Sequence, residues 1–405
     1  MRWRDRWKYV LFSSIICFVL LIVIETALTI YYYVTSGFVG FPLNRISTIT
    51  GKVNKEYQAK LYSLPWDHIK QKMRPGDYIT PAGIHYRVNS LGFRGKDFDP
   101  FHKTKYRVIC FGGSSTLGLE SSEDQTYPAV LERLLNENGI DAEVLNCGFG
   151  FKSLNYIEWL LFSEGIDYRP DLITINSNRN TAIYDAARFE NYEVVNSKLS
   201  AALIRYHFIL VDNCMTYRTL CSIARRIGTI SGTKGEIFSR YGYELQENFF
   251  KSTYPMKLER IIEAGKKHGF RVCLVKEPLY IFPEVQRQLL SYSIDQLWDL
   301  LKDKGMDVYE SRIMDRVGSK FYLISNAILN KHMDILKEKH REIIVVDSMD
   351  DFIGEHARSG ELFADYVHLT PKGNELLARR MFGDIYPVAS RKENTKSGMG
   401  TPSTR

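Results

Sequence analysis

The sequence predicts a doubly wound α/β fold, in which helices cover both faces of a five-stranded parallel sheet. Five short runs along the chain are almost entirely apolar, and amphipathic helical patterns separate them. Strands of a parallel sheet are buried on both faces, so they form continuous apolar runs rather than alternating patterns. With 405 residues, of which 44% are hydrophobic, the chain is long enough to bury a large core.

The beginning of the chain predicts a membrane anchor. A basic segment at residues 1–8 precedes an apolar run at residues 9–34, which is longer than the ~20 residues that a helix needs to cross a bilayer. Arginines before the run favour a cytoplasmic N-terminus, so the bulk of the chain is expected to be periplasmic or extracellular. A cleaved signal peptide is the alternative. The length of the run and the lack of a clear small-x-small cleavage site favour an uncleaved, single-pass signal anchor.

Residues 35–104 follow as a linker and a loop-rich lead-in, and the predicted globular domain spans residues 105–388. Its five strands are expected at residues 107–113, 142–149, 171–178, 271–278 and 342–349. Helical patterns are found at residues 127–139, 155–165, 256–269 and 376–386. Strands that alternate with helices in this way indicate βαβ units and a flavodoxin-like sheet.

Two intervals of the domain, residues 181–255 and 279–341, are too long for simple crossovers. Both have mostly helical patterns and are expected to form lids or side walls over the carboxyl edge of the sheet. The tail at residues 389–405 is polar and has no periodicity, which predicts disorder.

The net charge of +7 lies mainly at the two ends of the chain. Residues 1–8 and residues 391–405 each carry a net charge of +3, which leaves +1 for the residues between them. A nucleic-acid-binding domain would concentrate basic residues on its folded surface. Nucleic acid is therefore not expected as a partner, and the sequence identifies no protein partner.

The six cysteines predict neither disulfides nor a metal site. Cys110, Cys147 and Cys273 lie in strand runs, where buried structural thiols are usual. Cys214 and Cys221 lie in one predicted helix, where they would be ~10 Å apart and too distant to bond each other. Because metal-ligand spacings are also missing, neither a metal nor another cofactor is expected.

Polar residues follow several of the predicted strands. In an open parallel sheet, ligands bind outside the carboxyl ends of the strands. Residues 112–116, 148–151 and 176–180 lie there, after the first three strands. Asp365 and His368 follow the fifth strand and precede the last helix, so they belong to the same edge.

Three of these residues suit nucleophilic catalysis. A serine hydroxyl becomes an effective nucleophile when a histidine takes its proton and a carboxylate orients that histidine. Ser114, His368 and Asp365 are the candidates for these roles. Donors for the oxyanion are available from backbone N–H groups after the first two strands and from the side-chain amide of Asn180.

Each candidate also has a common structural use. Ser114 and Ser115 suit the capping of a helix, and Ser115 is expected to serve in that way. Asp365 and Asn180 are both suited to turns, and His368 to a partly buried structural position. Their ordered occurrence at one edge of the sheet is what favours a site.

The first and last of four sequence blocks resemble those of the SGNH hydrolases, also called GDSL esterases and lipases. FGGSSTLG at residues 111–118 resembles the family block FGDSxTxG, which implies that Ser114 is the nucleophile. DYVHLTPKG at residues 365–373 resembles DxxHLTPxG, which implies that Asp365 and His368 are the acid and the base.

The two middle blocks carry the resemblance to the oxyanion hole. NCGFGF at residues 146–151 resembles NxGxxG, which implies that the backbone N–H of Phe151 is a donor beside that of Ser114. PDLITINSNRNT at residues 170–181 resembles the third block, which implies that the Asn180 side chain is another donor. All four blocks occur in the family order, and together they cover residues 105–385.

The chain departs from the family pattern at three positions. Gly113 stands where the family name has Asp, Phe151 stands where a glycine is usual, and Asn178 replaces a glycine before the third-block asparagine. Upstream, NSLGFRG at residues 89–95 resembles a segment that precedes the first block in membrane-anchored bacterial relatives. Its Arg94 is expected to pack at the surface, outside the site, and contact with the active-site edge or with a substrate anion is the alternative.

The resemblance and the apolar N-terminus together imply a membrane-anchored serine esterase. Its substrate is expected to be an acyl ester on an envelope glycan or lipid, and no cofactor is required. An O-acyltransferase that acts on a cell-surface or secreted polysaccharide is the alternative, since a sugar hydroxyl can replace water. A catalytically silent binding protein with the same fold is the second alternative, which Phe151 and Asn178 motivate.

Overall fold

A computed structural model of the protein describes the chain in stretches. The longer stretches are residues 71–79, 83–150, 152–182, 247–279, 283–304, 320–352 and 367–397. The shorter ones are residues 12–16, 18–20, 22–27, 66–67, 185, 214, 216–217, 220 and 361–365.

The central sheet has five strands, all parallel, in the order β6-β5-β7-β8-β9. The strands are β5 (Tyr106–Gly112), β6 (Ala142–Gly148), β7 (Leu172–Asn176), β8 (Arg271–Lys276) and β9 (Ile344–Asp347). Each overlaps the run predicted for it. Numbered along the chain, the order is 2-1-3-4-5, which is the flavodoxin-like order and confirms the predicted α/β class.

The register brings the ends of three strands to one level. Gly112 of β5 pairs with Gly148 of β6 and with Asn176 of β7. Since β6 and β7 lie on opposite sides of β5, the direction of winding reverses there. Open α/β sheets bind their ligands outside the carboxyl ends of the strands at such a reversal.

Alternate residues of the strands pack on opposite faces of the sheet. Val108 and Cys110 belong to one hydrophobic cluster, with α4 and α15, whereas Ile109 and Phe111 belong to another, with α5, α10 and α13. The covering helices are α4 (Tyr127–Glu137), α5 (Leu154–Leu160), α10 (Tyr254–His268), α13 (Lys320–Lys339) and α15 (Pro371–Ser397). Side chains of a strand alternate between its two faces, so these all-apolar strands require cover on both.

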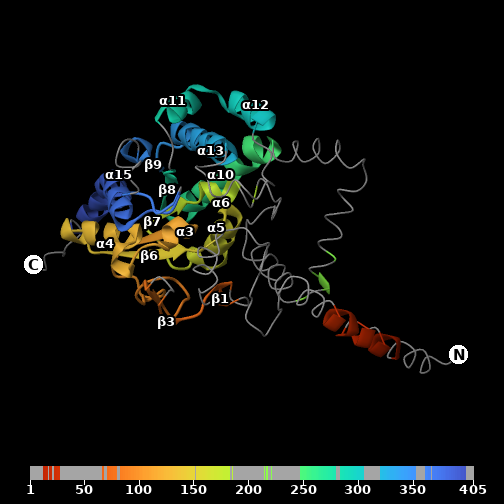
Figure 1. Cartoon of the computed structure of the whole chain (residues 1–405). Coiled ribbons are helices and arrows are strands. Elements are labelled where there is room, and N and C mark those ends of the chain that lie inside the picture. Colours follow the sequence, from red (N-terminus) through yellow and green to blue (C-terminus); the bar gives the residue numbers. More distant parts are fainter. Residues whose placement is uncertain are drawn as a thin grey trace, which may run out of the picture.

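Two further helices, α11 (Pro283–Ser291) and α12 (Ile294–Lys304), contact α13 and lie outside it, at the top of Figure 1. The described part of residues 279–341 is mostly helical, and the role of this interval as a lid or side wall stays a prediction. Most of the other long interval, residues 181–255, lies outside the described residues. One or two turns of helix are found at α3 (Ser114–Leu117), η1 (Glu123–Gln125), η2 (Leu161–Gly165), α6 (Asn178–Asn180), η4 (Phe249–Thr253) and η5 (Met349–Phe352).

Where the structure describes the lead-in, it has two short antiparallel hairpins, below the central sheet in Figure 1. Their strands are β1 (Trp66–Asp67), β2 (Lys72–Met73), β3 (Gly76–Ile79) and β4 (His85–Val88). Arg94 forms isolated bridges with Val88 of β4 and with Asn146 of β6. The lead-in is therefore joined to the edge of the central sheet.

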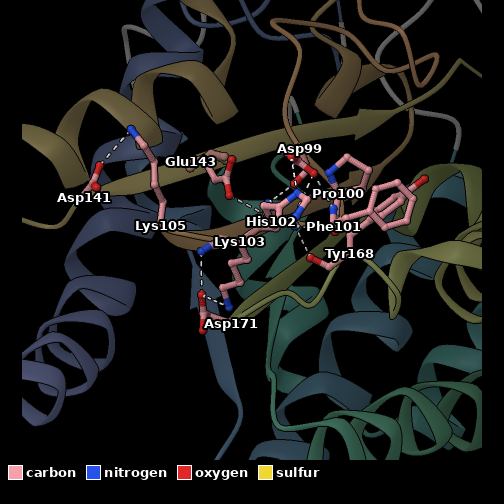
Figure 2. A network of polar contacts seen from close by, with 12 residues as sticks. Asp99, Pro100, Phe101, His102, Lys103, Lys105, Asp141, Glu143, Tyr168 and Asp171 are labelled. Carbon is pink, nitrogen blue, oxygen red and sulfur yellow. Dashed lines mark hydrogen bonds and ion pairs between the residues drawn. The ribbon is translucent and has the colours of Figure 1, made fainter.

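A polar network holds the lead-in against the amino ends of the strands (Figure 2). At its centre is Arg107 of β5, a fully buried residue whose Nε lies 2.7 Å from Glu143 Oε1. Its guanidinium also donates to the backbone carbonyls of Asp99 and Tyr168, at 2.6 and 2.5 Å. A buried charge is tolerated when it is paired and hydrogen-bonded in this way. The network therefore serves to join the lead-in to the amino edge of the sheet.

The last helix is longer than predicted. Residues 389–397, which were expected to be disordered, continue α15 to Ser397. Ala389 is fully buried and belongs to the hydrophobic cluster beneath α15, so packing extends the helix into the polar segment. Residues 398–405 lie outside the described residues.

Parts of the predicted membrane span at residues 9–34 are helical, namely residues 12–16, 18–20 and 22–27. Among the described residues, no helix combines the length and the apolar character that a crossing of the bilayer requires. The remainder of the predicted span lies outside the described residues. Glu25 accepts hydrogen bonds from the backbone and hydroxyl of Thr216, both at 2.7 Å.

The strand cysteines are buried, as predicted. Cys110, Cys147 and Cys273 are each at most 1% exposed, and burial raises the pKa of all three thiols. They and Cys214 are free thiols. Cys17 and Cys221 lie outside the described residues. Buried thiols with raised pKa values are unreactive, which fits a packing role.

Candidate active site

Ser114 begins α3 directly after β5 and is only 4% exposed. The turn between strand and helix depends on Gly112, where a Cβ would lie 1.9 Å from Thr116 Oγ1 and 2.4 Å from Asn176 O. A side chain at residue 112 is therefore excluded. The tight turn places the Ser114 hydroxyl at the carboxyl edge of the sheet, beside the reversal of winding.

Arg94 holds the other end of α3. Its guanidinium donates to the backbone carbonyls of Leu117, Gly118 and Ser121, at 2.7, 2.6 and 2.6 Å. The residue is only 3% exposed and lies over the ring of Tyr86, so the predicted surface position was wrong. The last carbonyls of a helix favour a cation. Arg94 thus fixes the short helix that carries Ser114.

His368 and Asp365 meet Ser114 at this edge. His368 Nε2 lies 2.8 Å from Ser114 Oγ, and His368 Nδ1 lies 2.6 Å from Asp365 Oδ2. The imidazole is 3% exposed, whereas the Asp365 side chain is 36% exposed. The three residues predicted from the sequence form one continuous row of hydrogen bonds from hydroxyl to carboxylate.

The local fold of residues 361–370 orients the acid and the base. Asp365 Oδ1 accepts hydrogen bonds from the backbone N–H groups of Val367 and His368, at 2.8 and 2.7 Å. Phe363 and Leu369 form an antiparallel bridge across this turn. Burial raises the pKa of Asp365, but the hydrogen bonds and the charge of His368 outweigh that effect and lower it to about 2. The carboxylate is therefore ionised at neutral pH.

Asn180, at the end of α6, lies against the nucleophile turn. Its Nδ2 donates to the carbonyl of Lys152 at 3.0 Å, and an amide nitrogen carries a second hydrogen. A Cβ at Gly113 would lie 2.3 Å from the same Nδ2. The amide of Asn180 thus fills the space that a side chain would need at residue 113, where the family pattern has Asp.

The side chain of Asn178, on the same short helix as Asn180, is hydrogen-bonded to α13 and α10. Its Nδ2 donates to Asn326 Oδ1 and Asn330 Oδ1 of α13, at 2.9 and 2.8 Å. Its Oδ1 accepts a hydrogen bond from the Tyr254 hydroxyl at 3.2 Å. The asparagine that replaces the family glycine therefore anchors α6 to α13 and α10. Phe151, the other departure in the predicted oxyanion hole, lies outside the described residues.

Ser115 has a different partner from its neighbour. Gly113 occupies the N-cap position of α3, and the Ser115 hydroxyl donates to Glu277 Oε1 at 3.0 Å. The predicted capping role of Ser115 was therefore wrong. Glu277 follows β8 and is 3% exposed, and its Oε2 accepts a hydrogen bond from the backbone N–H of Arg179 at 2.7 Å. Burial raises the pKa of Glu277, although the bonds from Arg179 and Ser115 oppose this.

Sequence patterns did not point to Glu277, and for Arg94 they favoured a surface position over contact with the active-site edge. One available signal for Glu277 was its place directly after the fourth strand, at the edge already singled out for the other segments. Its contacts with Ser115 and Arg179 depend on the strand order, because β7 lies between β5 and β8. For Arg94, the glycines on either side of residues 93–94 were a signal of a specific backbone turn.

Comparisons with known proteins give structural likenesses only. No protein-family model matches the sequence, and no curated protein matches it. Similar solved structures include an acetylxylan esterase from Geobacillus stearothermophilus, with 12% identity and a TM-score of 0.37 over 70% of this chain and 96% of that chain. A lipase/acylhydrolase from Enterococcus faecalis has 15% identity and a TM-score of 0.37, over 69% and 95% of the two chains. Likenesses this distant do not define the chemistry, which must be derived from the residues of the site.

Proposed function

We propose that this chain is a serine esterase of the SGNH type, in which Ser114 is the nucleophile. The observation that carries the proposal is the hydrogen-bonded row from Ser114 Oγ through His368 to Asp365, with contacts of 2.8 and 2.6 Å. A serine that contacts a histidine oriented by a carboxylate is the arrangement that activates a hydroxyl. Its place at the reversal of the sheet winding is where α/β proteins bind ligands.

In the acylation step, His368 Nε2 takes the proton of Ser114 while Ser114 Oγ bonds to the carbonyl carbon of the ester. The imidazolium that forms is stabilised by the ionised carboxylate of Asp365. The bond between the carbonyl carbon and the leaving oxygen then breaks, and His368 gives its proton to the departing alcohol. The product is an acyl group on Ser114.

The oxyanion of the tetrahedral intermediate requires donors in fixed positions. The backbone N–H groups of Ser114 and Phe151 are proposed for this role, together with the second amide hydrogen of Asn180. The contact between Asn180 Nδ2 and the Lys152 carbonyl supports the proposal, because it restricts the orientation of the amide. Deacylation repeats the sequence with water as the nucleophile and His368 as its base.

We further propose that the protein is held at a membrane by residues 9–34 and that its sheet domain lies outside the cytoplasm. The apolar run and the basic residues before it support this proposal. Its substrate would be an acyl ester of an envelope glycan or lipid. A reporter fused after Arg405 is expected to be active only outside the cytoplasm, and an active cytoplasmic reporter would contradict the topology.

The decisive experiment is labelling of the full-length protein, in detergent, with a fluorophosphonate that reacts with activated serines. The wild type and Ser115→Ala should both be labelled, and Ser114→Ala should not. Ser115 is the matched control because it is the adjacent buried serine on the same helix, and labelling is compared after complete reaction because loss of the Ser115–Glu277 hydrogen bond should affect only its rate. If the wild type stays unlabelled beside a known serine hydrolase that is labelled, the protein is a silent binding protein.

Hydrolysis and acyl transfer are separated by their products. Wild-type enzyme that has not been treated with the fluorophosphonate is supplied with an acyl donor, with and without polysaccharide acceptors. Free acid as the product in every mixture indicates an esterase. Acylated polysaccharide as the main product indicates an O-acyltransferase that uses the same Ser114.

A further inference from the structure

Glu277 is a buried acid that the proposed reaction does not use. It follows the last residue of β8 at the carboxyl edge of the sheet and is 3% exposed. Burying a carboxyl group costs free energy unless its oxygens accept hydrogen bonds. Both oxygens of Glu277 do accept them, one from the Ser115 hydroxyl at 3.0 Å and the other from the Arg179 N–H at 2.7 Å.

The two donors belong to different segments of the proposed site. Ser115 is the neighbour of the nucleophile Ser114 on α3, and Arg179 is the neighbour of the oxyanion donor Asn180 on α6. The two segments follow β5 and β7, and the carboxylate that joins them follows β8. A single side chain therefore links the segment of the nucleophile to the segment of the oxyanion donor.

The backbone of Glu277 is itself held in place. Its carbonyl accepts a hydrogen bond from Asn326 Nδ2 at 3.3 Å, and Asn326 Oδ1 accepts one from Asn178 Nδ2 at 2.9 Å. Asn178 precedes Arg179 on α6, so the contacts form a closed ring that returns to the Glu277 carboxylate. A closed ring of buried hydrogen bonds limits the independent movement of its members.

We propose that Glu277 is a positioning residue that sets the distance between the Ser114 hydroxyl and the Asn180 amide. The inference rests on the proposed esterase mechanism and deepens it. Glu277 acts through Ser115 and Arg179 and does not itself contact the reacting atoms. A misplacement of ~1 Å between reacting groups can cost on the order of 10²-fold in rate, so the ring has a direct effect on turnover.

The test uses hydrolysis of para-nitrophenyl acetate by the full-length protein in detergent. Glu277→Met removes both acceptors at similar volume and should lower kcat by on the order of 10²-fold with little change in KM. Glu277→Gln should retain most of kcat. Its amide oxygen can accept from the Arg179 N–H while its NH₂ group donates to the Ser115 hydroxyl.

A double-mutant cycle with Asn180→Ala separates positioning from general destabilisation. If Glu277 acts by aligning Asn180, Glu277→Met should lower kcat by less than about 10-fold in the Asn180→Ala background. Glu143→Met, at the amino edge of the sheet, is the matched control for loss of a mostly buried acid. It should lower the melting temperature, leave kcat unchanged and leave unchanged the factor by which Asn180→Ala lowers kcat.

The inference is overturned if Glu277→Met keeps kcat within about threefold of the wild type. It is also overturned if the decrease in kcat of the double variant equals the product of the decreases caused by Glu277→Met and Asn180→Ala alone. Where Glu277→Met does not fold, Glu277→Asp replaces it in the cycle, because its shorter side chain cannot reach both donors. Ser114→Ala is measured beside these variants. If Ser114→Ala retains turnover, the proposed function fails; if it loses turnover while the Glu277 variants do not, only the positioning role fails.

Discussion

Two segments with the pattern Asp-x-x-His lie at opposite edges of the same sheet. In both, the aspartate accepts hydrogen bonds from the backbone N–H groups two and three residues later, and its second oxygen contacts the histidine Nδ1. The Asp365–His368 pair has this contact at 2.6 Å, and the Asp99–His102 pair, which Figure 2 shows, has it at 2.9 Å. The local conformation is therefore nearly the same.

The two pairs differ in what surrounds the imidazole. The side chain of His102 is 84% exposed, whereas that of His368 is 3% exposed and its Nε2 contacts Ser114. Backbone and side-chain hydrogen bonds lower the pKa of Asp99 to about 2, the same value as that of Asp365. A carboxyl group with a lowered pKa beside a histidine is thus a property of the turn. A buried histidine in contact with a hydroxyl is the property that distinguishes the proposed active site.

The largest expected difference between the two edges concerns the histidines and the serine. Ser114→Ala and His368→Ala should each lower turnover of an aryl ester by roughly 10⁵-fold or more, and the double variant should be little worse, because the two residues act as a unit. His102→Ala should keep wild-type turnover. Steady-state kinetics of the full-length protein measure this, and turnover in Ser114→Ala would refute the serine mechanism.

The next difference concerns the two aspartates. Asp365→Asn should lower kcat by roughly 10³- to 10⁴-fold, less than loss of the nucleophile, because it removes only the orientation and stabilisation of the imidazolium. Asp99→Asn is the matched control in the same type of turn and should have no effect on kcat. Equal effects of the two substitutions on kcat would contradict the proposal that Asp365 acts by orienting His368.

Asn180→Ala should lower kcat by a smaller factor. This separates the role of the oxyanion donor from that of the hydrogen-bonded row of Ser114, His368 and Asp365. Removal of one such donor costs on the order of 10²-fold in kcat, or ~3 kcal/mol, with a weaker effect on KM. Asn136→Ala, near the end of α4, is a control that removes an amide bonded to Ala142 at the amino end of β6, away from the site. A change in KM alone on Asn180→Ala would assign Asn180 to substrate binding.

The smallest expected effects are on the pH dependence of stability. The pKa of Asp365 is lowered to about 2, so its stabilisation is present above the ordinary value of ~3.9 and is lost as the pH falls towards 2. The pKa of Glu277, which faces Arg179 and His368, is raised. Its contribution to the free energy of unfolding is therefore present below pH ~4.3 and is lost as the pH rises through the pKa of the folded state.

Urea unfolding of Asp365→Asn and Glu277→Gln at a series of pH values tests these opposite signs. At neutral pH the free energy of unfolding of Asp365→Asn should be lower than that of the wild type, and this difference should disappear as the pH falls towards 2. The free energy of unfolding of Glu277→Gln, relative to the wild type, should increase as the pH rises above ~4.3. Parallel curves for the wild type and Glu277→Gln would show that burial of Glu277 has no net effect on its ionisation.

The sequence predicted the sheet well because its strands are apolar on both faces. The same patterns located Ser114, His368 and Asp365, since parallel strands bring the residues that follow them to one edge. The Asp-x-x-His pattern occurs at both residues 99–102 and residues 365–368, and only the second segment follows the fifth strand.

What remained unpredicted depends on contacts between distant segments. Glu277 contacts Ser115 across a span of 162 residues, and Arg94 contacts Leu117 where the lead-in joins the sheet edge. Neither contact leaves a periodic pattern. Ser115 was expected to cap its helix because serine often does so, but Gly113 holds that position and a buried acid is available instead.

The close fit between Gly113 and the amide of Asn180 makes residue 113 a control on the geometry of the proposed oxyanion hole. A Cβ there would lie 2.3 Å from Asn180 Nδ2, which is the end of a side chain that can rotate. A side chain at residue 113 would therefore turn this amide away from the Lys152 carbonyl that now orients it. The absence of a side chain at residue 113 thus fixes the direction of a hydrogen-bond donor on another segment.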